Sequence, residues 1–383
     1  MINMINALGN TSATQLSLKA KIDQKRIENF LLKNLDKIKS SYLMKDSYFI
    51  EMFNCLEKNK KLNFQINKHE EIFILRRNNL QEILKYILFR YKFRISGKNK
   101  INSDFPQYIL IELVSACNFT CVFCFQSDKS FRKKPFVGVM KMELLKKVVD
   151  EADELGIGAV TFASRGEPTL HKNFCEIIQY TASKPNIFEV KVNSNGSFLT
   201  EKIAHAVFKN NVTQFVISAD HYIKEEYEKL RVGGNFEKVI KNLSMFKNIR
   251  DKYYKNCNTE IRVSGIDATK KIDKDKFANF WSDKCDHVTI GDPFEMSSTY
   301  ENTPKPELVQ PCEFLWDRMY VWYDGKANPC DLDYKSKLTF GNLNQDSIQK
   351  VWNSQIINNL RKMHLNNNRN KLIPCDRCGA EFD

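Results

Sequence analysis

The chain has 383 residues with a formal net charge of +13 at pH 7, and 42% of its residues are hydrophobic, enough for a sizeable globular core. The length suits two domains, or one large domain with appendages. The sequence holds no apolar run of about 18 residues, which excludes a membrane-spanning helix, and we expect no secretory signal at its start.

Residues 1–104 are predicted to form a basic, mostly helical extension. The first 100 residues hold 20 Lys and Arg against 9 Asp and Glu, and Leu31, Leu35 and Ile38 recur at helical spacing. The amphipathic stretch 80–95 either lies on a membrane surface or packs on the next domain, and we favour packing. The excess of basic residues has three possible explanations: this region binds an acidic partner, it binds a membrane surface, or its charges are simply solvated.

Residues 105–296 alternate between strand and helix patterns. Candidate strands lie at 108–114, 158–163, 187–193, 212–218, 259–264 and 286–290, with helical patterns between them. Six strands separated by helices predict an α/β fold, with a parallel sheet and its helices outside, as an open or closed barrel. In such barrels chemistry takes place at the carboxyl ends of the strands.

Residues 297–383 are predicted to form a small third domain. The segment 297–311 is rich in proline and polar residues, which is typical of a linker. Asp324 and Gly325 then stand between two short strand patterns, which indicates a hairpin. Residues 345–364 are predicted to be helical.

Three cysteines follow the first candidate strand directly. Cys117, Cys121 and Cys124 have the spacing C-x3-C-x2-C. Three thiolates would leave one iron of a [4Fe–4S] cluster without a protein ligand, and that iron can bind a small molecule. A zinc site is the alternative, but zinc usually takes four ligands, and no fourth Cys or His follows within a short loop.

Four further cysteines lie in the C-terminal region: Cys312, Cys330, Cys375 and Cys378. Four thiolates would fully ligate one [4Fe–4S] cluster, although zinc also accepts four cysteines. Seven of the eleven cysteines thus form two ligand-like groups, which favours metal binding over disulfides and a reducing compartment. We therefore expect the protein in the cytoplasm.

Together these motifs resemble the radical S-adenosylmethionine (SAM) enzymes that carry a C-terminal twitch domain, a shortened form of the SPASM domain. The resemblance covers residues 105–383. It implies a partial (βα)6 TIM-like barrel, a SAM-binding [4Fe–4S] cluster on the first three cysteines and an auxiliary [4Fe–4S] cluster on the last four. In this family the open iron binds the amino and carboxylate groups of SAM.

The resemblance also implies which residues contact SAM. The segment from Ser164 to Pro168 looks like the family's Gly-Gly-Glu-Pro segment, with Arg165 in place of the first glycine. Its glutamate binds the SAM amino group in the family. The implied contacts with SAM are Phe123, Gly166, Glu167, Asn195, Ser218 and Arg231.

The implied reaction is cleavage of SAM to a 5′-deoxyadenosyl radical, which takes a hydrogen atom from the substrate. The cysteine layout is similar to that of 2-deoxy-scyllo-inosamine dehydrogenase. We therefore predict two-electron oxidation of an alcohol carbon on a sugar-like or peptidyl substrate. Asp292 and Glu295 follow the sixth strand and are the candidate catalytic bases, and Arg262 is a candidate for orienting the hydroxyl. Electrons would come from an external donor such as flavodoxin or ferredoxin.

Three other functions stay open. A radical epimerase would need a second hydrogen donor, commonly a thiol, and four cysteines belong to neither ligand group: Cys55, Cys175, Cys257 and Cys285. A maturase of ribosomally made peptides would need a recognition module, and residues 1–100 are unassigned. A zinc-containing nucleic-acid-binding protein would explain cysteines and basic charge together, but the basic surplus lies away from the cysteines.

Overall fold

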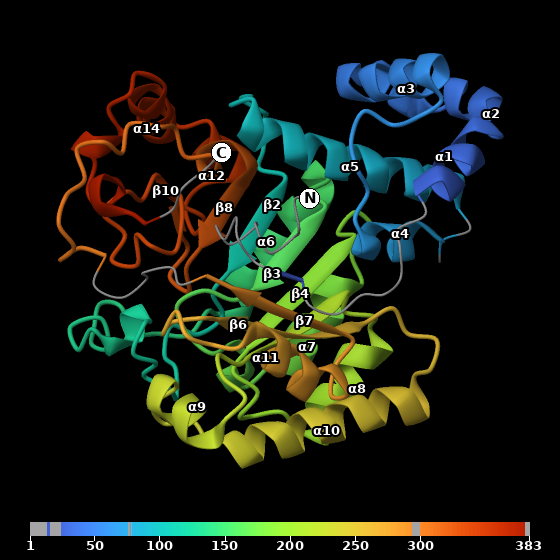
Figure 1. Ribbon diagram of the computed structural model, residues 1–383. Helices are drawn as coiled ribbons and strands as arrows, with labels where there is room; N and C mark the ends of the chain where they lie inside the picture. The colour runs from blue at the N-terminus through green and yellow to red at the C-terminus, as the bar shows by residue number, and fades with distance from the viewer. Residues whose placement is uncertain (1–13, 16–23, 76, 78, 293–298, 380–383) are drawn as a thin grey trace.

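A single mixed sheet forms the centre of the protein. The computed structural model describes residues 14–15, 24–75, 77, 79–292 and 299–379. In this part of the chain the strand order is β1-β7-β6-β5-β4-β3-β2-β8-β9-β10 (Figure 1). Neighbouring strands from β2 to β7 are all parallel, which confirms the predicted six-stranded α/β core. The six are β2 (Tyr108–Ile111), β3 (Ala159–Phe162), β4 (Glu189–Ser194), β5 (Gln214–Ser218), β6 (Glu260–Ile266) and β7 (His287–Gly291).

Helices between these strands cover the outer face of the sheet (Figure 1). The sequence predicts a helix between each pair of consecutive strands, and the structure has one in every connection. The short α9 (Lys224–Leu230) is an addition that the sequence pattern did not predict. The others are α6 (Met142–Leu155), α7 (Phe174–Ala182), α8 (Glu201–Lys209), α10 (Phe236–Tyr253) and α11 (Lys274–Ser282).

The two faces of the sheet belong to two different apolar cores. In β2, Ile109 and Ile111 pack with the outer helices, whereas Tyr108 and Leu110 pack with the N-terminal helices. This alternation follows from the two-residue period of a strand. Both faces of the sheet are therefore covered at β2, which explains why this strand is a continuous apolar run, whereas β4 and β6 alternate apolar with polar residues.

The N-terminal helices lie against the inner side of the sheet. They are α1 (Gln24–Leu32), α2 (Leu35–Lys39), α3 (Ser47–Asn59), α4 (Lys68–Leu75) and α5 (Leu80–Lys98). Helix α5 crosses the direction of the strands in Figure 1, and Ile83, Tyr86 and Phe89 are buried in the shared core. The predicted packing of the stretch 80–95 is thus confirmed. No helix in the described ranges is both long and apolar enough to cross a bilayer.

Buried polar contacts join these helices to the amino-terminal ends of two strands. Glu189 is the first residue of β4, and its carboxylate accepts a 2.7 Å hydrogen bond from the Tyr86 hydroxyl. Glu260 is the first residue of β6, and its Oε2 lies 3.0 Å from Nδ1 of His69. Helices α4 and α5 are therefore held at the end of the barrel opposite the carboxyl ends of the strands.

The C-terminal region adds strands to the same sheet. The predicted hairpin is confirmed, with β8 (Arg318–Val321) antiparallel to β9 (Lys326–Asn328), followed by β10 (Gly341–Asn342). Unexpectedly, β8 also pairs in parallel with β2, so the sheet continues from the barrel into this region. At the other edge, β1 (Thr14–Gln15) pairs antiparallel with β7.

The predicted helix over 345–364 is two helices. The structure has α13 (Ile348–Trp352) and α14 (Gln355–Leu365), because Ser354 has extended backbone angles that interrupt the helical hydrogen bonding. The domain limits at 104/105 and 296/297 stay a prediction. The second of them falls at residues 293–298, which lie outside the described residues.

Candidate active site

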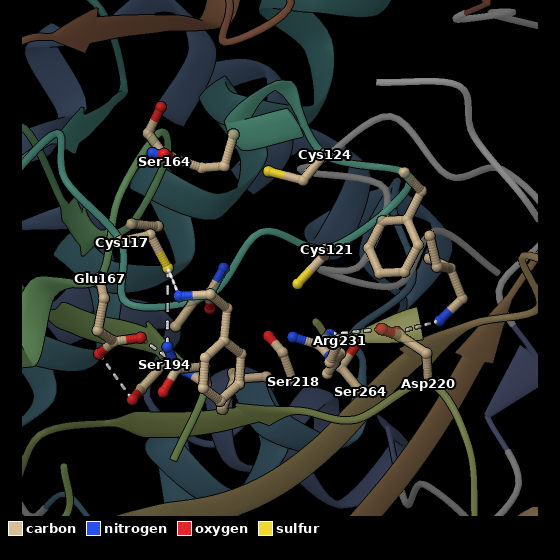
Figure 2. Close-up of a pocket in the computed structure, with 18 of the residues that line it drawn as sticks. Cys117, Cys121, Cys124, Ser164, Glu167, Ser194, Ser218, Asp220, Arg231 and Ser264 are labelled. Atoms are coloured by element: carbon tan, nitrogen blue, oxygen red, sulfur yellow. Dashed lines mark hydrogen bonds and ion pairs between the residues drawn. The ribbon is translucent and has the colours of Figure 1, made fainter. Parts of the chain in front are cut away.

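The carboxyl ends of β2 to β7 surround a cavity of about 260 Å³. This is where the barrel rule places chemistry. Cys117, Cys121 and Cys124 all line it, and Figure 2 shows their three sulfurs directed toward one common space. The wall also contains every residue that the sequence assigned to SAM: Phe123, Gly166, Glu167, Asn195, Ser218 and Arg231.

The cysteine loop is held by backbone hydrogen bonds. The Thr120 amide donates to the Val232 carbonyl at 2.8 Å, and the Val122 amide donates to the Leu230 carbonyl at 3.0 Å. Burial raises the pKa of the Cys117 thiol to about 12 and raises the pKa of Cys121 and Cys124 as well. These thiols therefore lose their protons only on binding iron, which couples cluster insertion to proton release.

The loop after β3 passes very close to the cysteine loop. A Cβ on Gly166 would lie 2.1 Å from the Val114 carbonyl oxygen and 2.5 Å from that of Ala116. Because both neighbours are backbone atoms, only glycine fits there. Ser164 has a φ of 95°, a strained value for a residue other than glycine. The close approach places Glu167 beside the cysteines.

The Glu167 carboxylate is buried and has capacity for one more donor. Its Oε1 accepts hydrogen bonds from Thr169 and from the Ser194 hydroxyl, whereas Oε2 accepts only the Asn195 amide, at 2.7 Å. A carboxylate has about four lone-pair positions, two on each oxygen. Oε2 can therefore accept a further donor from the cavity, as binding of an ammonium group requires.

Arg165 explains how the loop tolerates the replacement of a glycine. Its guanidinium makes two 2.5 Å hydrogen bonds to the Glu112 carboxylate and a 2.7 Å bond to the Tyr334 carbonyl. It also stacks on Trp322, 4.2 Å from the ring centre. Arg165 is thus a structural residue that ties the SAM-type loop to β2 and to the C-terminal region.

Arg231 lies in the cavity wall as an ion pair. Its Nη2 is 2.7 Å from Oδ2 of Asp220, and its guanidinium lies 5.8 Å from the Phe123 ring centre. Figure 2 shows this pair on the side of the cavity opposite Glu167. The sequence singled out Arg231 but not its partner Asp220. Asp220 lies two residues after Ser218, the last residue of β5, and this place just beyond a strand end could have identified it.

The structure does not support Asp292 as a catalytic base. Its Oδ1 lies 3.0 Å from Nζ of Lys274, and its side chain is about half exposed. Asp292 is also absent from the described residues that line the cavity. Glu295, the other candidate, lies outside the described residues.

A different carboxylate opens into the cavity. Asp331 belongs to the cavity wall and directly follows Cys330, and burial raises its pKa to about 6. Sequence reasoning missed Asp331 because it belongs to the C-terminal region, more than 200 residues from the cysteine loop. Only the pairing of β8 with β2 brings it to the barrel mouth.

The four C-terminal cysteines lie close enough to influence one another electrostatically, with Cys378 buried and the other three partly buried. The pKa of Cys330 is raised far above its ordinary value. Burial is the largest cause, and the neighbouring thiols of Cys375, Cys378 and Cys312 add to it. Arg369 is buried beside them and pairs electrostatically with three of the four sulfurs. Four thiols with a buried counter-cation suit a fully ligated, negatively charged iron–sulfur cluster.

Comparisons with known proteins agree with both sites. The family description "Radical SAM superfamily" matches residues 111–261, and "Iron-sulfur cluster-binding domain" (SPASM) matches residues 312–379. Each match contains one of the two cysteine groups. Because both families bind iron–sulfur clusters through such cysteines, the comparisons favour iron–sulfur clusters over zinc at both groups.

Three comparisons with individual sequences and structures illustrate the likeness. S-adenosyl-L-methionine-dependent 2-deoxy-scyllo-inosamine dehydrogenase of Niallia circulans is 23% identical over 70% of this chain and 91% of its own length. The crystal structure of BtrN with AdoMet and 2-DOIA has a TM-score of 0.51, with 21% identity over 73% of this chain and 94% of its own. Streptococcus suis SuiB bound to precursor peptide SuiA has a TM-score of 0.57, with 15% identity over 94% of this chain and 88% of its own.

Proposed function

Because the chain is a radical SAM enzyme with a C-terminal SPASM domain, we propose that it oxidises an alcohol carbon by two electrons. The substrate would be sugar-like or peptidyl. One observation carries this proposal: the carboxylate that follows an auxiliary-cluster cysteine opens into the same cavity as the three cysteines of the first cluster.

The cysteines fit two [4Fe–4S] clusters, the first with SAM and the second fully ligated. Reduction of SAM at the first cluster supplies the oxidant that removes a hydrogen atom from carbon. The protein's own groups then hold the reactants. Glu167 accepts the SAM ammonium through Oε2, and Arg231 with Asp220 forms the opposite wall, where Ser218 ends β5.

In this proposal Asp331, rather than Asp292, is the catalytic base, and Glu295 stays a candidate outside the described residues. The Asp331 carboxylate would accept a hydrogen bond from the substrate hydroxyl and receive its proton as the carbonyl forms. Its position beside Cys330 supports the assignment, because the substrate would lose its proton next to the auxiliary cluster, which can accept the remaining electron.

The distribution of the other cysteines favours oxidation over epimerisation. Epimerisation needs a second hydrogen donor near the abstracted position, commonly a thiol. Among the described residues of the cavity wall, the only cysteines are the three cluster ligands. Cys285 is buried outside the cavity, with its thiol donating to the carbonyls of Trp281 and His287.

A peptide substrate is the second candidate. The likeness to SuiB spans 94% of this chain and therefore includes part of the N-terminal helices, whereas the likeness to BtrN spans 73% of the chain. In either case we infer an external one-electron donor such as flavodoxin or ferredoxin. We also infer a reducing compartment such as the cytoplasm, because seven of the eleven cysteines fall into two ligand groups that suit iron–sulfur clusters rather than disulfides.

The test is the reaction in heavy water with hydroxylated sugars and peptides as candidate substrates. Oxidation gives a product two hydrogens lighter by mass spectrometry, with one 5′-deoxyadenosine formed for each product. A product with deuterium at an inverted carbon would instead establish epimerisation and contradict the proposal.

A further inference from the structure

Arg262 is a buried cation in the cavity wall. It stands on the inner face of β6 between Glu260 and Ser264, and it is 4% exposed. Its Nε is buried and has no hydrogen-bond partner among the described residues. No described carboxylate lies within 4.0 Å of its guanidinium. Arg262 therefore lines the cavity without an ion-pair partner among the described residues.

The other two arginines of the wall are compensated. Arg165 is paired with Glu112, and Arg231 is paired with Asp220. Burial lowers the pKa of Arg262 to about 10, so it stays charged at neutral pH. A buried charge without a partner is costly, and such groups are normally paired or bound to a ligand.

The nearest acid on the same strand is already engaged. Glu260 contacts His69 at 3.0 Å and His287 at 3.2 Å, at the amino-terminal end of the barrel. Its interaction with Arg262 is electrostatic only. The cavity side of the guanidinium therefore remains open for an external anion.

Two further polar groups of the wall lack strong partners. The Oδ1 of Asn193, the second-last residue of β4 on the same inner face, is buried without a hydrogen bond among the described residues. Asp331 lines the cavity, and within the described chain no cation lies within 4.0 Å of its carboxylate. Both are acceptors, and both suit a hydroxyl donor.

We propose that Arg262 binds an anionic group of the substrate, a carboxylate or a phosphate, while Asn193 and Asp331 receive its hydroxyls. The substrate class is thus a hydroxylated acid, such as a sugar acid, a sugar phosphate or an acidic peptide residue next to a hydroxylated one. This inference rests on the proposed function, whose substrate it specifies.

The carboxylate of SAM is the other source of an anion. The methionyl part of SAM must lie against the cysteines, which follow β2. In the sheet order, β6 is separated from β2 by β3, β4 and β5. Arg262 therefore lies on the part of the wall that remains for substrate, and a guanidinium matches a carboxylate or phosphate in a two-point contact.

The test is calorimetric titration of cluster-loaded protein saturated with SAM. The probes are glycolate and inorganic phosphate, with ethylene glycol as the neutral counterpart of glycolate. We expect the native protein to bind both anions, Arg262→Gln to bind them at least about tenfold more weakly, and Arg262→Lys to retain part of the affinity. Arg132→Gln, at an exposed position, is the matched control and should bind as the native protein does.

The affinity for SAM separates the two sources of the anion. Unchanged SAM affinity in Arg262→Gln, together with lost anion binding, supports the proposal. Weakened SAM binding with unchanged anion binding assigns Arg262 to the SAM carboxylate and overturns it. Absence of anion binding by the native protein, or equal binding by native and Arg262→Gln, also overturns it. Circular dichroism and iron content show whether Arg262→Gln is folded, and Arg262→Lys keeps the test valid if it is not.

Failure of the proposed function has a separate readout. If native cluster-loaded protein with dithionite forms no 5′-deoxyadenosine, the radical reaction is wrong whatever the titrations show. If native protein and Arg262→Gln both form it while only the native protein binds glycolate, the anion site is established independently of the net reaction.

Discussion

At the scale of single residues, the site depends on a close contact between two loops. Gly166 brings the loop after β3 against the carbonyls of Val114 and Ala116, which precede the first cysteine. Glu167 follows at once, and its four donors fix its carboxylate in the cavity wall. Backbone sterics thus set the distance between the SAM-binding carboxylate and the cysteines.

Gly166→Ala should separate these loops. The added Cβ meets two backbone oxygens, so the free energy of unfolding should fall by about 1–3 kcal/mol, a typical cost of overpacking. SAM affinity should fall with it, because Glu167 is displaced. Gly156→Ala is the control, since its Cβ has open space and only the positive φ is strained. It should lose stability but keep SAM affinity, as measured by thermal denaturation and SAM titration.

Glu167→Gln tests the assigned ammonium contact directly. Replacing the carboxylate by an amide removes a charge-assisted hydrogen bond, worth roughly 1.5–3 kcal/mol, so SAM should bind about tenfold or more weakly. Iron content should stay unchanged because no cluster ligand is altered. Native-like SAM affinity in an equilibrium titration would refute the assignment.

At the scale of elements, helices α4 and α5 are joined to the barrel through buried charges. Glu70 is almost fully buried and accepts hydrogen bonds from Arg90 and from Arg94, the latter at 2.5 Å. His69 reaches Glu260 at the start of β6. Burial opposes the charged form of His69, but the Glu260 carboxylate outweighs it and raises the pKa of His69.

This contact makes the docking of the helices sensitive to pH. A group with a raised pKa in the folded state stabilises the fold fully below its unfolded pKa, about 6.5 for histidine. That stabilisation is lost as pH rises through the folded pKa. The Tm advantage of the native protein over His69→Gln should therefore shrink from pH 6 to pH 9. A constant difference across this range would show that His69 is not charged in the fold.

At the scale of the whole molecule, one continuous sheet carries two metal sites. The first three cysteines follow β2, and Cys330 follows the hairpin that β8 begins. Two [4Fe–4S] clusters predict about eight irons per chain. Replacing Cys117, Cys121 and Cys124 together by Ala should leave about four irons and abolish SAM cleavage. Iron and sulfide analysis after anaerobic purification measures this, and zinc without sulfide would contradict it.

The parallel core could be predicted because its signals are local. A continuous apolar run marks β2, strand and helix patterns alternate after it, and the cysteine spacing lies within eight residues. The pairing of β8 with β2 joins segments about 200 residues apart, and no local pattern encodes it. The same pairing brings Asp331 into the cavity, which is why the sequence pointed to Asp292 instead. The lack of a partner for Arg262 is likewise visible only when all neighbouring strands are in place.

The parallel pairing of β8 with β2 has a consequence for modularity. β2 has β3 on one edge and β8 on the other, and the Glu112 amide beyond its end donates to the Val321 carbonyl. Excising the C-terminal half would leave one edge of β2 bare, next to the loop that binds the first cluster, and would remove the Tyr334 carbonyl from Arg165. The barrel and the C-terminal region therefore cannot be exchanged between homologues as independent domains. A chimaera that respects this fold must transfer β2, the cysteine loop and β8 together.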